Sequence, residues 1–147
     1  MPVFNSVEIA MASFGQKNGL EVLIDPHAST ASTNGKCVYL PLVSKDNESA
    51  MWGFVHHEAA HVRLSDFSAI SGIPSRIFSI LNCIEDVWIE YNTIITGYVG
   101  AKKRFNDLNQ MLIEKGEWGV VSKGMQPISA VCMYACLYGA YKITGYK

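Results

Sequence analysis

The segment His57-Glu58-Ala59-Ala60-His61 is an HExxH motif, and it constrains both the local structure and the chemistry of this chain. Two histidines four residues apart lie one turn apart on the same face of a helix. Neutral imidazoles at that spacing can bind one Zn²⁺ at about 2.0–2.1 Å. Glu58 lies between them, where it can accept a proton from a water molecule that the metal activates. The motif predicts metal-assisted hydrolysis, with His57 and His61 as metal ligands and Glu58 as general base.

The length and composition favour one folded domain. A chain of 147 residues suits a single hydrophobic core, so we predict one domain over residues 1–147. Apolar residues make up 49% and charged residues 17%, which excludes wholesale disorder. The net charge of -1 provides no basic field for a nucleic-acid partner. No secretory signal is visible, and the apolar stretch 128–140 is too short to span a bilayer, so we expect a cytoplasmic protein without a membrane partner.

The four cysteines are too few and too scattered for a disulfide scaffold. They are Cys37, Cys83, Cys132 and Cys136. Cys132 and Cys136 are four residues apart and can share a helix face, where we expect small buried side chains rather than metal ligands. This cysteine usage favours a reducing compartment.

The periodicity of apolar residues predicts a mainly helical α+β chain with a small hairpin or sheet before the motif helix. We expect helices over residues 4–18, 48–64, 75–96, 100–115 and 127–143, and strands over residues 20–25 and 36–43. Pro41 would remove a ladder hydrogen bond, which favours an edge position for the second strand. Asp46 or Asn47 is suited to cap the motif helix. The last helix is strongly apolar and ends close to Lys147. It packs into this domain, continues into a longer protein, or offers a surface for self-association or a partner.

A catalytic zinc needs a third protein ligand and an open position for water. His56 adjoins the motif, but neighbouring residues on a helix point about 100° apart, so it cannot easily reach the metal. Positions 64 and 67 are Leu64 and Phe67, so the chain lacks the third histidine of a metzincin. The remaining candidates are the carboxylates of segment 82–90.

Glu85, Asp86 and Glu90 follow His61 by 24 to 29 residues, which allows a helix to fold back antiparallel on the motif helix. Asp86 and Glu90 are four apart on one face with Asn82 a turn before them. This polar stripe can supply one ligand and one partner for a ligand histidine. Glu85 instead flanks the apolar side, as a ligand pointing into the interior would, and its charge would be costly there without a metal. We prefer Asp86 as third ligand, with Glu85 as the open alternative.

On these residues the chain resembles a zincin, specifically a gluzincin-like zinc metallopeptidase. The stretches HEAAHVRLSDF, from His57 to Phe67, and NCIEDVWIE, from Asn82 to Glu90, are similar to metallopeptidase-like domains of bacterial and phage proteins. Some of those domains are joined to von Willebrand factor A domains. The usual gluzincin order, Glu followed by Asp four residues later, is reversed here. The resemblance covers about residues 50–95 and implies a Zn²⁺ cofactor, a protein or peptide substrate and hydrolysis of peptide bonds.

The sequence supports two function hypotheses. In the first, a zinc metallopeptidase, Glu58 passes the water proton to the leaving amine, and the strand at 36–43 aligns the substrate. Arg63 is expected to pair with Asp66 rather than to face the substrate. Candidate oxyanion donors are Tyr91, Tyr98, Tyr134, Tyr138 and Tyr141. The alternative is a non-catalytic metal-binding scaffold or interaction module derived from a metallopeptidase, which would have no need of Glu58.

Overall fold

The computed structural model of the chain describes residues 2–42, 44, 47–118 and 122–145. Over these residues it is a mainly helical α+β structure with one three-stranded sheet, which confirms the predicted class. The helices are α1 (Pro2–Phe14), α2 (Glu48–Leu64), α3 (Ser75–Ile95), α4 (Ala101–Glu114) and α5 (Pro127–Thr144). The strands are β1 (Glu21–Asp25), β2 (Ser32–Thr33) and β3 (Cys37–Pro41). Each predicted helix and strand is present, and β2 lies in a segment expected to be a loop.

The sheet has the strand order β1-β3-β2, so β3 is its central strand. β3 pairs in parallel with β1, with Cys37 opposite Glu21, and antiparallel with β2, with Tyr39 opposite Ser32. The prediction that this strand lies at the edge is therefore wrong. Pro41 is tolerated because it is the last residue of the strand, where a missing N–H does not interrupt the ladder. The exposed edge next to α2 belongs to the short strand β2.

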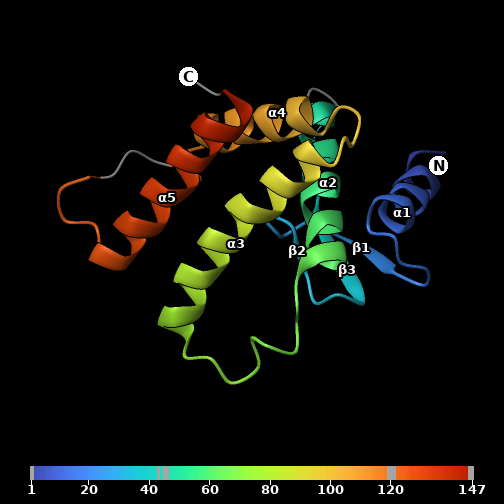
Figure 1. The fold of residues 1–147 in the computed structure, drawn as a ribbon. Coiled ribbons are helices and arrows are strands. Elements are labelled where there is room, and N and C mark those ends of the chain that lie inside the picture. Colours follow the sequence, from blue (N-terminus) through green and yellow to red (C-terminus); the bar gives the residue numbers. More distant parts are fainter. Residues whose placement is uncertain (1, 43, 45–46, 119–121, 146–147) are drawn as a thin grey trace.

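Helix α2 runs through the middle of the molecule, with α1 and the sheet on one side and α3 and α5 on the other (Figure 1), and it also packs against α4. Alternate residues of β3, Val38 and Leu40, are fully buried against it together with Phe54 and Val55 of α2. On another side α4 approaches closely at Gly53. A Cβ atom there would lie 2.6 Å from the carbonyl oxygen of Arg104, so only glycine permits this contact.

Arg63, near the end of α2, joins three helices. Its guanidinium donates hydrogen bonds to the carbonyl oxygen of Phe14 (2.7 Å) and to Oγ1 of Thr93 (2.8 Å). It also lies 4.1 Å from the ring centre of Tyr98. The predicted pair between Arg63 and Asp66 is wrong, because Asp66 accepts hydrogen bonds from the following turn instead.

The first helix ends at Phe14, four residues before the predicted end at residue 18, and the predicted capping of α2 also differs. Asn47 occupies the N-cap position of α2, but its side chain makes no capping hydrogen bond. Asp46, the other predicted cap, lies outside the described residues. Among the described residues, no helix combines the length and the apolar character that crossing a membrane requires.

Candidate metal centre

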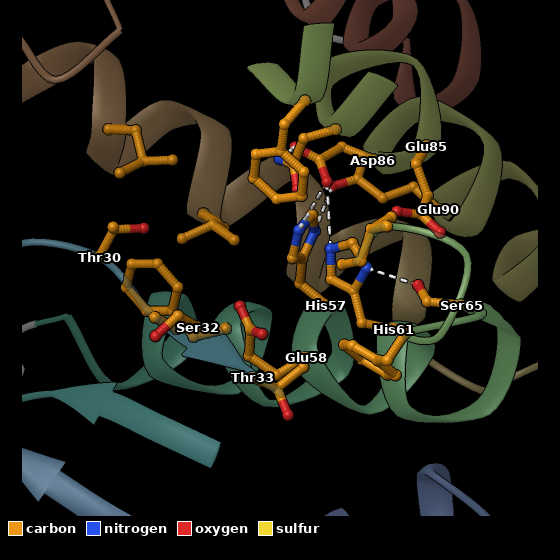
Figure 2. Close-up of a pocket in the computed structure, with 18 of the residues that line it drawn as sticks. Thr30, Ser32, Thr33, His57, Glu58, His61, Ser65, Glu85, Asp86 and Glu90 are labelled. Carbon is orange, nitrogen blue, oxygen red and sulfur yellow. Dashed lines mark hydrogen bonds and ion pairs between the residues drawn. The ribbon is translucent and has the colours of Figure 1, made fainter. Parts of the chain in front are cut away.

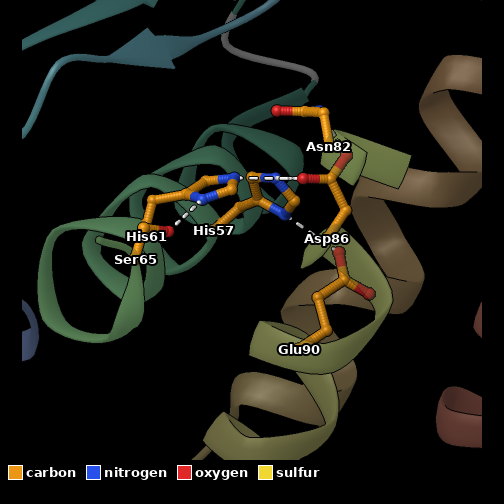
Figure 3. A network of polar contacts seen from close by, with 6 residues as sticks. All are labelled: His57, His61, Ser65, Asn82, Asp86 and Glu90. Carbon is orange, nitrogen blue, oxygen red and sulfur yellow. Dashed lines mark hydrogen bonds and ion pairs between the residues drawn. The ribbon is translucent and has the colours of Figure 1, made fainter. Parts of the chain in front are cut away.

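Three side chains meet between α2 and α3 in the way that the HExxH motif and the acidic segment predict. His57 and His61 lie one turn apart on α2, and Asp86 faces them from α3 (Figure 3). Oδ1 of Asp86 is 3.1 Å from Nε2 of His61 and 3.6 Å from Nε2 of His57. One donor atom from each residue lies within 4.8 Å of the other two. Among the described residues, this is the group of side chains that can hold a metal ion.

The spacing of these atoms fits zinc. Ligands at 2.0–2.2 Å around a tetrahedral Zn²⁺ lie about 3.3–3.6 Å from one another, and the two contacts of Asp86 Oδ1 fall close to this range. That oxygen is buried and makes no hydrogen bond of good geometry, although it contacts both imidazoles. Its other oxygen, Oδ2, accepts a hydrogen bond from Asn82 Nδ2 at 3.0 Å, which orients the carboxylate. The two imidazoles and the carboxylate are a donor set that zinc prefers.

The far nitrogen of each histidine is held by a second residue. Nδ1 of His57 lies 3.0 Å from Oε1 of Glu90, and Nδ1 of His61 lies 2.9 Å from Oγ of Ser65. Glu90 is buried and comes from the same helix face as Asp86. These contacts direct the Nε2 atoms of both rings towards the shared point, as partners of ligand histidines do in zinc sites.

The charges of the site are set by burial and by the ion pair across it. Burial alone would lower the pKa of His57, but its contacts with Asp86 and Glu90 outweigh burial and hold the pKa well above the usual value. Burial would raise the pKa of Asp86, yet the two imidazoles lower it. In the absence of a cation, a proton on His57 therefore offsets part of the negative charge of the site. A divalent cation can take over that role once the histidine is deprotonated.

Glu58 lies beside this group with its side chain almost completely buried. Burial is the main cause that raises the pKa of its carboxyl group, while the neighbouring histidines partly oppose the rise. Figure 2 shows Glu58 facing the same pocket as His57 and His61, opposite Ser32 and Thr33 of the sheet. A carboxyl group whose pKa is raised by burial is suited to accept a proton and to release it again during a reaction.

The site opens into a pocket with a volume of about 350 Å³. One wall is formed by residues 30–33, which include the edge strand β2. Apolar side chains form much of the remaining surface: Phe54, Phe67, Ile70, Phe78, Leu108, Leu112 and Trp118. The pocket therefore combines a metal-type donor group with apolar surface and an available strand edge.

Asn109 of α4 also lines the pocket and is the functional candidate that sequence reasoning missed. Its side chain is 1% exposed, and neither Nδ2 nor Oδ1 has a hydrogen-bond partner. Such an amide is costly unless something binds to it. The only sequence signal is its position one turn after Phe105, within the apolar stripe of α4.

Several predicted site residues are not part of the grouped donor set. Glu85 lines the pocket but is not one of the three grouped residues. His56 points away, as predicted, and stacks on Phe14 with ring centres 4.4 Å apart. None of the five candidate tyrosines lines the pocket. The predicted oxyanion donors are therefore not placed to contact a substrate in this pocket.

The cysteines of α5 do not join the metal group. Cys132 and Cys136 face Cys83 of α3, and all three are free thiols. Burial raises the pKa of Cys83, and burial together with the charges of Asp86 and Glu90 raises the pKa of Cys136 to about 11. The three half-buried thiols are not among the grouped donor atoms, so we describe them as part of the contact between α3 and α5.

Comparisons with known proteins add no relative to this description. No protein-family model, no curated protein and no solved structure matches the chain. The case for a function therefore depends on the side chains of the site itself.

Proposed function

We propose that this protein is a zinc-dependent hydrolase, a metallopeptidase with a zincin-like arrangement. His57, His61 and Asp86 would hold the metal. The observation that carries the proposal is the meeting of their donor atoms within 4.8 Å of one another beside Glu58, a buried carboxyl group with a raised pKa. An HExxH helix facing an antiparallel helix with an acidic ligand is the arrangement that the resemblance implies.

Each residue of the site has a separate role in the proposed reaction. Bound zinc would supply Lewis-acid chemistry, which brings the pKa of a water molecule towards about 7. Glu58 accepts the proton of the attacking water and then donates it to the amine that leaves. Glu90 and Ser65 keep the two histidines oriented through the hydrogen-bonding contacts at their Nδ1 atoms. The apolar pocket walls limit competing water around the reacting groups.

An extended peptide is the substrate that best suits the pocket. β2 lies at the edge of the sheet, and its residues Ser32 and Thr33 form part of the pocket wall. A peptide can add to such an edge as a further strand through backbone hydrogen bonds. The apolar wall that includes Phe54 and Leu112 would then receive a hydrophobic side chain of the substrate.

The test compares wild type with Glu58→Gln on a broad mixture of peptides, after zinc content has been measured for both. We expect Glu58→Gln to keep about one zinc per chain and to lose about 100- to 10,000-fold in hydrolysis, because the ligands remain and the base is removed. Glu85→Gln is the matched control, since it removes a carboxylate from the same pocket wall. It should keep activity within a few fold of wild type.

Two results would count against the proposal. Hydrolysis by Glu58→Gln at the wild-type rate would remove the assigned role of this residue. A wild-type protein that binds zinc but cleaves no peptide would instead support the alternative, a metal-binding scaffold or interaction module without catalysis.

A further inference from the structure

Helix α3 carries a regular row of large apolar side chains on its outer surface. The row consists of Ile77, Leu81, Ile84, Trp88, Tyr91 and Ile95. Each exposes between 42% and 58% of its surface. The spacing alternates between four and three residues along the whole helix, which is the heptad pattern of a helix that packs along another helix. These six residues are called the α3 stripe below.

Helix α5 carries a second row with the same kind of spacing. It consists of Val131, Tyr134, Tyr138 and Tyr141, called the α5 stripe, and each member is at least 49% exposed. The helix has a single charged residue, Lys142, and is apolar around most of its circumference. A helix of this kind is normally covered on all sides. Among the described elements, however, α5 packs against α3 and α4 alone, so its other side is left uncovered by them.

The two stripes belong to helices that lie side by side. Cys132 contacts the carbonyl oxygen of Ser79, and further along both helices Gly139 lies against Val87, so α3 and α5 run parallel. Figure 1 shows this pair on the side of the molecule away from α1 and the sheet. The arrangement therefore presents two parallel heptad rows on the outer surface of the molecule.

Helix α3 directs its polar side into the molecule and its apolar side outward, which is the reverse of what burial of apolar surface favours. The polar row of Asn82, Asp86 and Glu90 faces α2, where it builds the metal centre. Residues 84 and 88 are two positions from residue 86 and so lie about 200° around the helix from it. The metal centre thus turns the apolar side of α3 outward, and another surface must cover it.

We infer that the α3 and α5 stripes bind a second copy of this chain, so that two helix pairs form a four-helix bundle. Ten large side chains that each expose about half of their surface present on the order of 1,000 Å². A stable dimer needs about 800 Å² from each partner. Neither stripe contains a charged residue, so two copies of the face meet without like-charge repulsion. A symmetric dimer requires such a self-complementary patch.

A lipid surface is a poorer match for this face. Peripheral binding to anionic lipid depends on clustered cations beside the apolar side chains. Arg76 at the start of α3 and Lys142 near the end of α5 are the cations on the described parts of these two helices. Lys142 moreover lies over the rings of Tyr138 and Tyr141, at 5.4 and 5.6 Å from their centres. The heptad spacing is explained by a helical partner and has no role at a membrane.

The association state of the purified full chain tests this inference, and the experiment does not depend on zinc or on catalysis. Sedimentation velocity between about 1 and 100 μM should show a dimer for wild type. Tyr134→Glu and Ile84→Glu each place a charge on one stripe at a position that is exposed in the single chain. Each should raise the dissociation constant at least about 100-fold, because an unpaired charge would be buried at the interface.

Ile9→Glu is the matched control, because Ile9 is 70% exposed on α1, away from both stripes. It should dimerise as wild type does, and circular dichroism should show that all variants keep their helices. A wild-type monomer at about 100 μM would overturn the inference. Unchanged dimerisation in both stripe variants would also overturn it, as would a monomer that co-sediments with phosphatidylserine vesicles.

Discussion

At the scale of single residues, the most informative side chain is that of Asn109, which has no hydrogen-bond partner. Asn109 is buried in the pocket wall with both polar atoms free of hydrogen bonds, close to residues that could act on a substrate. An unpaired buried amide lowers stability, and this cost is consistent with a role in binding. Such an amide would form its hydrogen bonds only when a substrate is bound. The HExxH spacing predicted the residues of α2, whereas the only sequence signal for Asn109 is its position within the apolar stripe of α4.

Replacement of Asn109 by leucine should stabilise the protein and impair its activity. We expect the free energy of unfolding to rise by about 1–3 kcal/mol, since an unsatisfied buried amide is exchanged for an apolar side chain of similar size. Urea denaturation measures this directly. Asn106→Leu is the control on the same helix, because the Asn106 side chain accepts a hydrogen bond from Thr144 and its loss should not stabilise the fold. A destabilised Asn109→Leu would contradict the assignment.

His56 should make stability depend on pH in the acidic range. Burial, aided by the charges of Arg104 and Arg63, lowers its pKa from 6.5 to about 4. The unfolded chain therefore binds this proton more readily than the folded chain. Stability is fully present above about pH 6.5 and is lost as the pH falls towards 4, by roughly 3 kcal/mol in total.

The variant His56→Phe isolates this contribution, because phenylalanine can keep the stack on Phe14 and has no proton to bind. Urea unfolding of both proteins at about pH 7 and pH 4.5, with a chelator present, gives the comparison. The variant should lose less stability between the two pH values than wild type. An equal loss in both proteins would show that His56 is not the group responsible.

At the scale of helices and strands, residue spacing predicted the helix packing correctly, but the order of the strands in the sheet was predicted wrongly. The distance from His61 to the acidic residues predicted that α3 folds back on α2, and the contact between Asp86 and His61 confirms this. The position of β3 was predicted wrongly from Pro41, because a proline restricts only its own ladder bond. The central position of β3 depends on β2, whose two residues are too few to produce a periodic pattern.

The close contact between α2 and α4 depends on a helical glycine. An alanine at position 53 would place its Cβ 2.6 Å from the Arg104 carbonyl oxygen and 2.6 Å from Cβ of Leu108. We expect Gly53→Ala to destabilise the protein by about 1–3 kcal/mol, because α4 must move and the gain in helix propensity of about 0.5–1 kcal/mol does not compensate. Thermal unfolding measures the effect. A variant as stable as wild type would mean that α4 can shift without cost.

Gly139→Ala provides a comparison within the same molecule. Its Cβ would clash with the side chain of Val87 on α3 rather than with a carbonyl oxygen of the main chain. Valine is stiff at χ1 in a helix, so α5 would have to shift away from α3. Gly139→Ala should therefore also destabilise the protein, by about 1–3 kcal/mol under the same conditions, and a variant as stable as wild type would mean that α5 can shift without cost.

At the scale of the whole molecule, the sequence predicted a mainly helical α+β chain, and the structure confirms it. The polar row of Asn82, Asp86 and Glu90 predicted which side of α3 faces α2, but the sequence did not predict that the apolar row would lie exposed. An apolar heptad row in a chain of this length is expected to point into the core, yet here the core side of α3 is occupied by the polar residues Asp86 and Glu90. The exposure follows from the contacts of Asp86 and Glu90 with histidines of a distant segment, which a local pattern does not contain. The candidate metal centre and the outward apolar face are therefore linked through a single helix.

The central claim is that His57, His61 and Asp86 hold one zinc ion. Elemental analysis of protein purified without added metal tests it most directly, for wild type beside Asp86→Ala and Glu85→Ala. We predict about one zinc per chain in wild type and in Glu85→Ala, and loss of zinc in Asp86→Ala, because only Asp86 lies among the grouped donor atoms. Wild-type protein without zinc, even after zinc is supplied, or Asp86→Ala protein that retains it, would contradict this account.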